Sequence, residues 1–269
     1  MSEPAIGVFD SGLGGLTAVK ELVKVLPHEN IVYFGDTARV PYGNRSSETI
    51  KKYASQDAYF LLSKGVKLII AACGTVSSVA TDLAQTLPVP FTGVVEPTAA
   101  AAVKSTRSGR IGIIGTSATI NSNSYKREIL RRNDNITVFQ QKCPLFVSLV
   151  ENGFIRADDS VVRLVVERYL SPLKAEGIDT LILGCTHFPI IAKAISDYLG
   201  DDVTLIDSGR ETALYAADVL RNEALLSKST ESGKCSYFVS DTTESFRATA
   251  EIFLGHSVEG EVSHVRPGA

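Results

Sequence analysis

Long apolar runs and clusters of basic residues are both missing from this chain of 269 residues. No stretch approaches the roughly 18 consecutive apolar residues that a membrane-spanning helix needs. The first residues, Met1 to Gly7, have neither the basic nor the apolar region of a secretory signal. Lysine and arginine occur in runs no longer than two, and the net charge is −3. These absences predict a cytoplasmic protein that binds neither a membrane nor nucleic acid.

Cysteine is scarce, and its spacing excludes two of its common uses. The chain has four cysteines with no C-x-x-C pair among them. In a reducing compartment this pattern argues against a disulfide framework and against a zinc site. We therefore predict free thiols and no bound metal.

A complete dinucleotide-binding motif is also missing. The turn Gly12-Leu-Gly14-Gly15 follows a predicted strand, but it lacks the third glycine at the required spacing and an acidic ribose partner in the expected place. No nicotinamide cofactor is expected. The loop is interpreted instead as presenting backbone N–H groups to a carboxylate or to a closing side chain.

Two short apolar runs that end in cysteine are the most informative features present. Cys73 follows the run Leu68 to Ala72, and Cys185 follows Leu181 to Gly184, so the two thiols lie 112 positions apart. Three further segments recur at similar offsets: 6–9 with 111–114 and 31–34 with 136–139 at 105, and 91–97 with 203–209 at 112. The chain is therefore predicted to contain two related halves, with Cys73 and Cys185 facing each other across one cleft.

The alternation of strand-like and helix-like patterns predicts parallel sheets covered on both faces. Strands are predicted at residues 5–9, 31–35, 67–72, 91–95, 110–115, 136–140, 179–184, 203–206 and 235–240. Helices are predicted from a Thr17 cap to before Pro27, and at 47–64, 76–86, 97–106, 120–133, 158–176, 188–199, 209–223 and 242–253. Ligands of such sheets bind at the carboxyl ends of strands, where Asp10, Cys73, Thr116 and Cys185 fall.

The two cysteines suggest a particular kind of chemistry. A cysteine at a helix N-terminus gains stability for its thiolate from the free N–H groups and the helix dipole. A single buried cysteine is more often a small apolar core residue, but the duplicated placement of Cys73 and Cys185 favours function. Two thiols across one cleft suit proton exchange at a carbon, where one face loses a proton and the other gains one. The pattern predicts racemisation or epimerisation.

Several polar residues are candidates to assist these thiols. Asp10 is a candidate partner of Cys73, and His187 is the equivalent candidate beside Cys185. The hydroxyls of Thr75, Thr116 and Thr186 are candidate donors to a small anion, although threonine is also a common helix cap. Glu151 follows an apolar run and, from composition alone, is interpreted as a solvated surface residue.

Seven segments resemble the cofactor-independent glutamate racemases of the aspartate/glutamate racemase superfamily, and together they extend over nearly the whole chain. They are residues 6–15, 33–43, 72–75, 95–97, 114–116, 143–147 and 183–189. The resemblance implies interconversion of L- and D-glutamate without pyridoxal or any other cofactor, supplying D-glutamate for peptidoglycan, in a cytoplasmic homodimer.

The resemblance also implies a fold and a set of roles. The fold is two similar parallel-sheet α/β domains related by pseudo-twofold symmetry, residues 1–97 plus 209–269 and residues 98–208, with the active site in the cleft between them. Cys73 is implied to act on D-glutamate and Cys185 on L-glutamate, with Asp10 and His187 as auxiliary groups. Glu151 is implied to be a further polar residue on the His187 side. The implied substrate contacts are Asp10, Ser11, Pro41, Tyr42, Gly43, Gly74, Thr75, Thr116, Thr186 and His187.

One position departs from the family pattern. The usual Cys-Asn-Thr is Cys73-Gly74-Thr75 here, so a side-chain amide that normally contacts the substrate is replaced by a backbone N–H. Losing one hydrogen bond to a charged group is worth about 1.5–3 kcal/mol, which changes affinity about tenfold or more.

Three other functions stay open at this point. The chain can be an aspartate or other amino-acid racemase of the same superfamily, or a non-catalytic protein whose two domains close on a dicarboxylate. A thiol hydrolase is disfavoured because no cysteine has its own Cys-His-Asp/Asn set.

Overall fold

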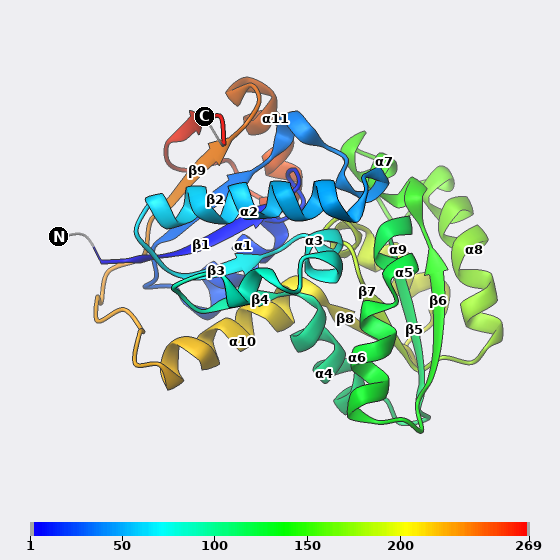
Figure 1. The fold of residues 1–269 in the computed structure, drawn as a ribbon. Helices are drawn as coiled ribbons and strands as arrows, with labels where there is room; N and C mark the ends of the chain where they lie inside the picture. The colour runs from blue at the N-terminus through cyan, green and yellow to red at the C-terminus, as the bar shows by residue number, and fades with distance from the viewer. Residues whose placement is uncertain (1–2, 268–269) are drawn as a thin grey trace.

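Two parallel β-sheets form the framework of the protein in the computed structural model, which describes residues 3–267 (Figure 1). The first contains β1 (Ala5–Asp10), β2 (Ile31–Gly35), β3 (Val66–Ala71), β4 (Phe91–Gly93), β9 (Cys235–Val239) and β10 (Val262–His264), in the spatial order β10-β9-β2-β1-β3-β4. The second contains β5 (Arg110–Gly115), β6 (Thr137–Lys142), β7 (Thr180–Leu183) and β8 (Thr204–Asp207), in the order β6-β5-β7-β8. The predicted fold class, two parallel-sheet α/β domains, is confirmed.

The two sheets repeat one topology. The order β2-β1-β3-β4 of the first sheet corresponds to β6-β5-β7-β8 of the second. The central ladders also share a register, because Ile6 pairs with Leu68 and Ile111 pairs with Thr180. These partners differ by the same offsets, 105 and 112, that recur in the sequence. Cys73 and Cys185 therefore follow their strands at equivalent positions.

The outer strands are displaced relative to this repeat. Ile6 pairs with Ile31, whereas Ile111 pairs with Val138, so the predicted equivalence of Ile31 with Ile136 is wrong by two residues. The pairing of β4 with β3 and the pairing of β8 with β7 differ by the same two residues. A shift of two residues leaves each side chain on the same face of the sheet. The apolar pattern is therefore unchanged, and sequence comparison alone does not detect the shift.

Helices cover both faces of each sheet. On the first sheet, α1 (Leu16–Val25) and α11 (Thr243–Leu254) pack on one face, α10 (Ser208–Asn222) packs against α1, and α2 (Ser47–Ser63) covers the other face. On the second, α7 (Pro144–Glu151), α8 (Ser160–Ala175) and α9 (Ala192–Leu199) lie on one side, and α4 (Val95–Ser105), α5 (Ser117–Ser122) and α6 (Ser124–Arg132) on the other. The apolar strands are thus buried on both faces, as parallel sheets require.

Some helices differ from the prediction for local reasons. The helix predicted at 120–133 is divided into α5 and α6 at Asn123, whose φ of 55° interrupts the helix; asparagine tolerates this conformation better than most residues. The helix predicted at 76–86 is two pieces, α3 (Gly74–Val79) and a 3-10 turn, η3 (Leu83–Gln85). Thr17 is not a cap: it lies inside α1, whose N-cap is Gly15.

Two elements, α7 and β10, were not predicted at all. α7 begins with Pro144 in its first turn, a position where proline is favoured because its missing N–H has no partner there in any case. β10 is a three-residue strand at the edge of the first sheet, too short to show an alternating pattern.

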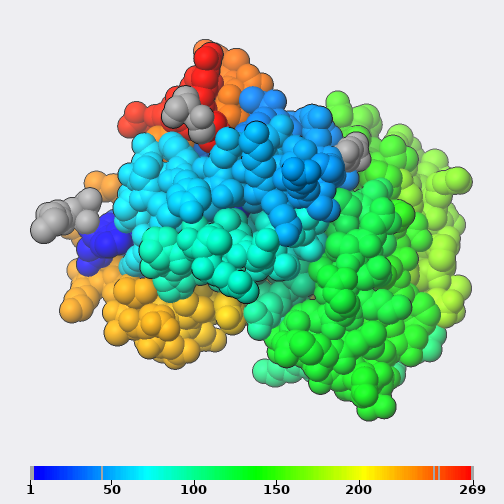
Figure 2. Space-filling view, in the orientation of Figure 1, coloured from blue at the N-terminus to red at the C-terminus, as the bar shows by residue number. Residues whose placement is uncertain are grey.

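The two domains are in contact over a continuous boundary. In the space-filling view, the cyan surface of the first domain meets the green surface of the second (Figure 2). At this boundary α3 packs against α5 and α6. Within residues 3–267, no helix has both the length and the apolar character needed to cross a membrane.

Candidate active site

A cavity of about 380 Å³ lies between the two domains, at the carboxyl ends of β1, β3, β5 and β7. This volume is within the range of small-ligand sites, roughly 300–1,000 Å³. Residues from both domains line it. All of the predicted site residues are among them: Asp10, Ser11, Pro41, Tyr42, Gly43, Cys73, Gly74, Thr75, Thr116, Glu151, Cys185, Thr186 and His187.

Cys73 lies in an environment that favours the protonated thiol. It caps α3 directly after the fully buried strand β3, and its side chain is only 6% exposed. Its sulfur donates toward Ser11 Oγ across 3.4 Å. Burial raises the pKa of the Cys73 thiol to about 12, and the charge of nearby Asp10 acts in the same direction. Cys73 therefore carries its proton at neutral pH.

Asp10 ends β1 and is itself buried. One of its carboxylate oxygens, Oδ2, accepts the Gly12 N–H at 2.9 Å, while Oδ1 has no protein partner. The Gly12 N–H of the glycine-rich loop is thus bonded to Asp10 within the same turn. Burial raises the pKa of Asp10, and the charge of His187 opposes that shift.

Cys185 has a cationic partner in place of a carboxylate. Its sulfur lies 3.7 Å from His187 Nδ1, and His187 Nε2 lies 3.1 Å from Glu151 Oε1. Burial lowers the pKa of His187, but hydrogen bonds to Cys185 and Glu151 outweigh it and raise the pKa to about 10. His187 is therefore an imidazolium at neutral pH, and its Nδ1 is a cationic donor beside the Cys185 sulfur.

Glu151 combines both of its predicted features. Its side chain is 51% exposed at the end of α7, as expected of a surface residue, yet Oε1 contacts the buried ring of His187. The contact orients the ring, because a hydrogen bond at one ring nitrogen determines what the other can do.

The polar lining of the cavity is dominated by hydroxyl and backbone groups. Thr116 caps α5 by accepting the Thr119 N–H at 3.3 Å, and its hydroxyl lies 3.3 Å from that of Thr75 in the other domain. Among the described residues no lysine or arginine lines this cavity. An anionic ligand is therefore held by neutral donors and by His187. No group of three or more His, Cys, Asp or Glu side chains in residues 3–267 is placed to hold a metal ion.

The glycine-rich turn after β1 packs directly against the second domain. A side chain at Gly14 would place its first carbon 2.1 Å from Thr186 Oγ1, so only glycine fits there. Thr17 Oγ1 also lies 3.1 Å from the Thr186 carbonyl oxygen. The turn therefore allows the loop after β7 to approach closely, which is a second use besides presenting the Gly12 N–H.

Some lining residues were missed by sequence reasoning. Thr119, Val147 and Ser148 line the cavity from α5 and α7. The last two were missed because α7 was not predicted; the signal for it was proline at position 144. Thr119 is buried with its hydroxyl 3.1 Å from that of Thr116, the N-cap of α5; it was missed because the helix was predicted to begin at residue 120.

Comparison with known proteins identifies close relatives. A family model described as Asp/Glu/Hydantoin racemase matches residues 9–216. The chain is 47% identical to the glutamate racemase of Geobacter metallireducens over 97% of this chain and 96% of that one, and 47% identical to that of Chlorobaculum tepidum over 94% and 93%.

Solved structures agree with this relationship. Glutamate racemase from Francisella tularensis, in complex with D-glutamate, superposes with a TM-score of 0.91 at 40% identity, covering 100% of this chain and 99% of the other. Glutamate racemase isoform RacE1 from Bacillus anthracis gives a TM-score of 0.92 at 37% identity, covering 97% and 98%. The expected family is thereby confirmed: the chain belongs to the Asp/Glu/hydantoin racemase family.

Proposed function

We propose that this protein is a cofactor-independent glutamate racemase in which Cys73 and Cys185 are the acid/base pair. One observation carries the proposal: two thiols follow equivalent strands of a repeated fold and line one cavity. The relationship to glutamate racemases supports glutamate as the substrate.

The proposed reaction is one deprotonation and one reprotonation on opposite faces of the α-carbon. With L-glutamate, the Cys185 thiolate takes the α-proton, and the Cys73 thiol delivers its own proton to the other face. The products are D-glutamate, a Cys185 thiol and a Cys73 thiolate. With D-glutamate the two thiols exchange roles. Asp10 assists Cys73, and His187, held by Glu151, assists Cys185.

The proposed substrate contacts are neutral donors around the two thiols. Hydroxyls of Ser11, Thr75, Thr116 and Thr186 are placed to bind carboxylate and amine groups, together with the segment 41–43 and the backbone at Gly74. Donors fixed in a buried site stabilise charge that develops on the carboxylate as the α-proton leaves. Closing the domains over the substrate excludes water and strengthens these interactions.

Further proposals concern the whole molecule. We propose domain boundaries at 1–97 plus 209–269 and 98–208, supported by the two passages of chain between the sheets, from β4 to β5 and from β8 to β9. We also propose a homodimer, and a cytoplasmic location in which D-glutamate is supplied for peptidoglycan. The location is supported by four free cysteines.

Circular dichroism in deuterated buffer tests the central proposal. Purified protein is incubated with L-glutamate and, separately, with D-glutamate, without added cofactor, and α-deuteration is followed by mass spectrometry. Decay of both signals to zero with deuterium at the α-carbon is the expected result. Decay with aspartate but not glutamate would identify another racemase of the superfamily. Stable signals without exchange for either amino acid would indicate a binding protein.

A further inference from the structure

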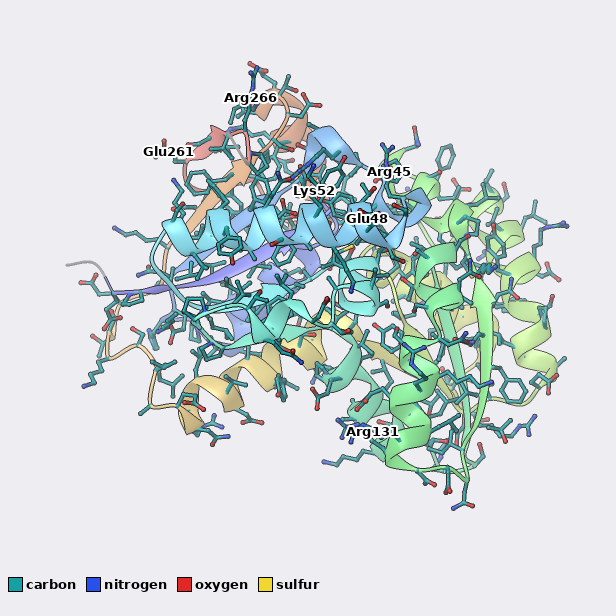
Figure 3. All side chains as sticks on the ribbon, in the orientation of Figure 1. Arg45, Glu48, Lys52, Arg131, Glu261 and Arg266 are labelled. Carbon is teal, nitrogen blue, oxygen red and sulfur yellow. The ribbon has the colours of Figure 1, made fainter. Side chains whose placement is uncertain are left out.

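A buried carboxylic acid in α2 is not used by the mechanism above. Asp57 lies in the apolar stripe of this helix, among Ile50, Ala54, Ala58 and Leu61, and is 0% exposed. Other charged residues of α2 are on the solvent side: Figure 3 shows Glu48 and Lys52 on the outer face of the helix. A carboxyl group in the buried stripe is costly unless it is paired or neutral.

Asp57 belongs to a buried network next to the active-site segment 41–43. Its Oδ1 accepts from Arg39 Nη2 at 2.8 Å, and its Oδ2 lies 3.1 Å from the Tyr42 hydroxyl. Asp36, also fully buried, accepts from Arg39 Nε at 2.5 Å, from Ser240 Oγ at 2.8 Å and from the Tyr42 hydroxyl. Two carboxyl groups thus share one guanidinium and one phenol.

The hydrogens of this network leave a place for a proton on Asp57. The Tyr42 hydroxyl has a single hydrogen and lies within hydrogen-bonding distance of both carboxyl groups, with the shorter contact to Asp36. When that hydrogen is donated to Asp36, a protonated Asp57 can donate to the Tyr42 oxygen and complete the second contact. Burial and the charge of Asp36 both raise the pKa of Asp57 well above its ordinary value of 3.8. Both observations favour a neutral Asp57.

The charges around Asp57 come from several elements. Asp36 and Arg39 follow β2, Tyr42 is in the next turn, and Asp10 ends β1. Asp10, like Asp36, disfavours the ionised form, whereas Arg39 favours it. The guanidinium also lies 4.1 Å above the ring of Tyr53, which is on α2 itself. One cation pairs with two carboxyl groups, Asp36 and Asp57, so the uncharged form of Asp57 reduces the repulsion between them.

The buried network of Asp57 is connected to the active-site cavity through Tyr42. This side chain is buried and lies between Pro41 and Gly43, and all three residues line the cavity. Gly43 faces Thr116 of the second domain, because a side chain there would lie 3.6 Å from Thr116 Cβ. We infer that Asp57 is a proton-bearing positioning residue that, through Tyr42, fixes the segment 41–43 for the substrate. This inference rests on the proposed function.

Two substitutions separate the proton from the side chain itself. Asp57→Asn keeps the shape, donates to Tyr42 through its amide N–H and still accepts from Arg39. Asp57→Ala removes both bonds. With glutamate as substrate, we expect Asp57→Ala to raise KM about tenfold or more with a smaller effect on kcat, since the hydrogen bond that the charged Arg39 donates to this side chain is lost. Asp57→Asn should stay within about threefold of wild type. Asp82→Asn is the control, since Asp82 is exposed and pairs with Lys51.

The pH dependence of thermal unfolding provides a readout independent of catalysis. A folded-state pKa raised above the unfolded value means that wild-type stability falls as pH rises between the two values. Asp57→Asn carries no such proton. The midpoint temperature of Asp57→Asn minus that of wild type should therefore increase as the pH is raised from about 5 to about 8. The corresponding difference for Asp82→Asn should not increase.

The outcomes are separable. A midpoint difference between Asp57→Asn and wild type that does not change with pH would show that Asp57 is ionised and overturn the inference. So would an Asn variant as impaired in KM as a folded Ala variant, or an Ala variant with an unchanged KM. If glutamate is not a substrate at all, the proposed function fails, and the unfolding measurement still decides whether Asp57 holds the proton.

Discussion

The two halves of the cavity have the same backbone plan and different electrostatics. Cys73-Gly74-Thr75 follows β3 and Cys185-Thr186-His187 follows β7, at equivalent positions of matching sheets. The first thiol lies near a buried carboxylate, and its pKa is raised to about 12. The second contacts a histidine whose pKa is raised to about 10. The repeated fold thus accounts for the placement of the thiols, and the residues around them give the two thiols neighbours of opposite charge.

This difference matches the separate roles of the two thiols in the proposed mechanism. Cys73 holds its proton and is the acid when L-glutamate is the substrate. His187 is a cationic donor beside Cys185, the proposed base for that enantiomer.

Removing either thiol should have the largest effect. Because each direction needs one thiol as base and the other as acid, Cys73→Ser and Cys185→Ser should each lower turnover of both enantiomers by roughly 10²–10⁴-fold. Turnover is measured by circular dichroism. Cys235→Ser is the control, since that thiol lies on β9 away from the cavity. A Cys73→Ser variant with wild-type turnover in both directions would remove the two-thiol mechanism.

The auxiliary groups test the asymmetry directly. Asp10→Asn and His187→Asn should each lower kcat/KM, by roughly 10²-fold for the buried histidine. The ratio of kcat/KM for L-glutamate to kcat/KM for D-glutamate cannot show which thiol a substitution affects. The two enantiomers have equal free energy, so kcat/KM must be the same in both directions. Primary isotope effects can: His187→Asn should increase the effect of α-deuteration mainly for L-glutamate, and Asp10→Asn mainly for D-glutamate. Equal increases for both enantiomers in both variants would contradict the assignment of sides.

Gly74 differs from its counterpart Thr186 in having no room for a side chain. A Cβ at position 74 would lie 2.6 Å from the carbonyl oxygen of Gly184 in the other domain. Overpacking of this kind costs about 1–3 kcal/mol, so Gly74→Ala should lower kcat/KM about tenfold. Gly74→Asn should do no better, although it restores the amide usual in the family. Steady-state kinetics check this, and the unfolding midpoint shows how much of the cost falls on the stability of the fold; wild-type activity of the alanine variant would show that the domains adjust freely.

Glu151→Gln should have the smallest effect. Glu151 raises the pKa of His187, so replacing it with the neutral glutamine should lower the pH above which L-glutamate turnover declines. The shift should be less than about one pH unit because the carboxylate is half exposed. A raised histidine pKa stabilises the folded protein below about pH 6.5, and this stabilisation is lost as pH rises through about 10. The variant should therefore lose stability relative to wild type near neutral pH. An unchanged pH profile would exclude the predicted role of Glu151.

The sequence was sufficient for the general plan and for most of the residues that line the cavity. Buried parallel strands are continuous apolar runs, and the two cysteines end such runs, so both the sheets and the placement of the thiols were predictable. The two-residue displacement of β6 was not, because it preserves the pattern of buried residues. Thr119 was missed because the helix was predicted to begin at residue 120, whereas α5 begins at Ser117. Asp57 was missed because its role depends on Arg39, which lies 18 positions away in the sequence.

The contacts between the domains around the cavity are mostly bonds between uncharged groups. They include Thr17 with the Thr186 carbonyl, Thr75 with Thr116, and Ser124 with Ser78 at 2.8 Å. Such bonds contribute about 0.5–1.5 kcal/mol each and are little affected by dissolved ions, in contrast to salt bridges at a surface. In the proposed mechanism the domains close over the substrate, so opening them for product release breaks these contacts and should have nearly the same rate at low and high ionic strength.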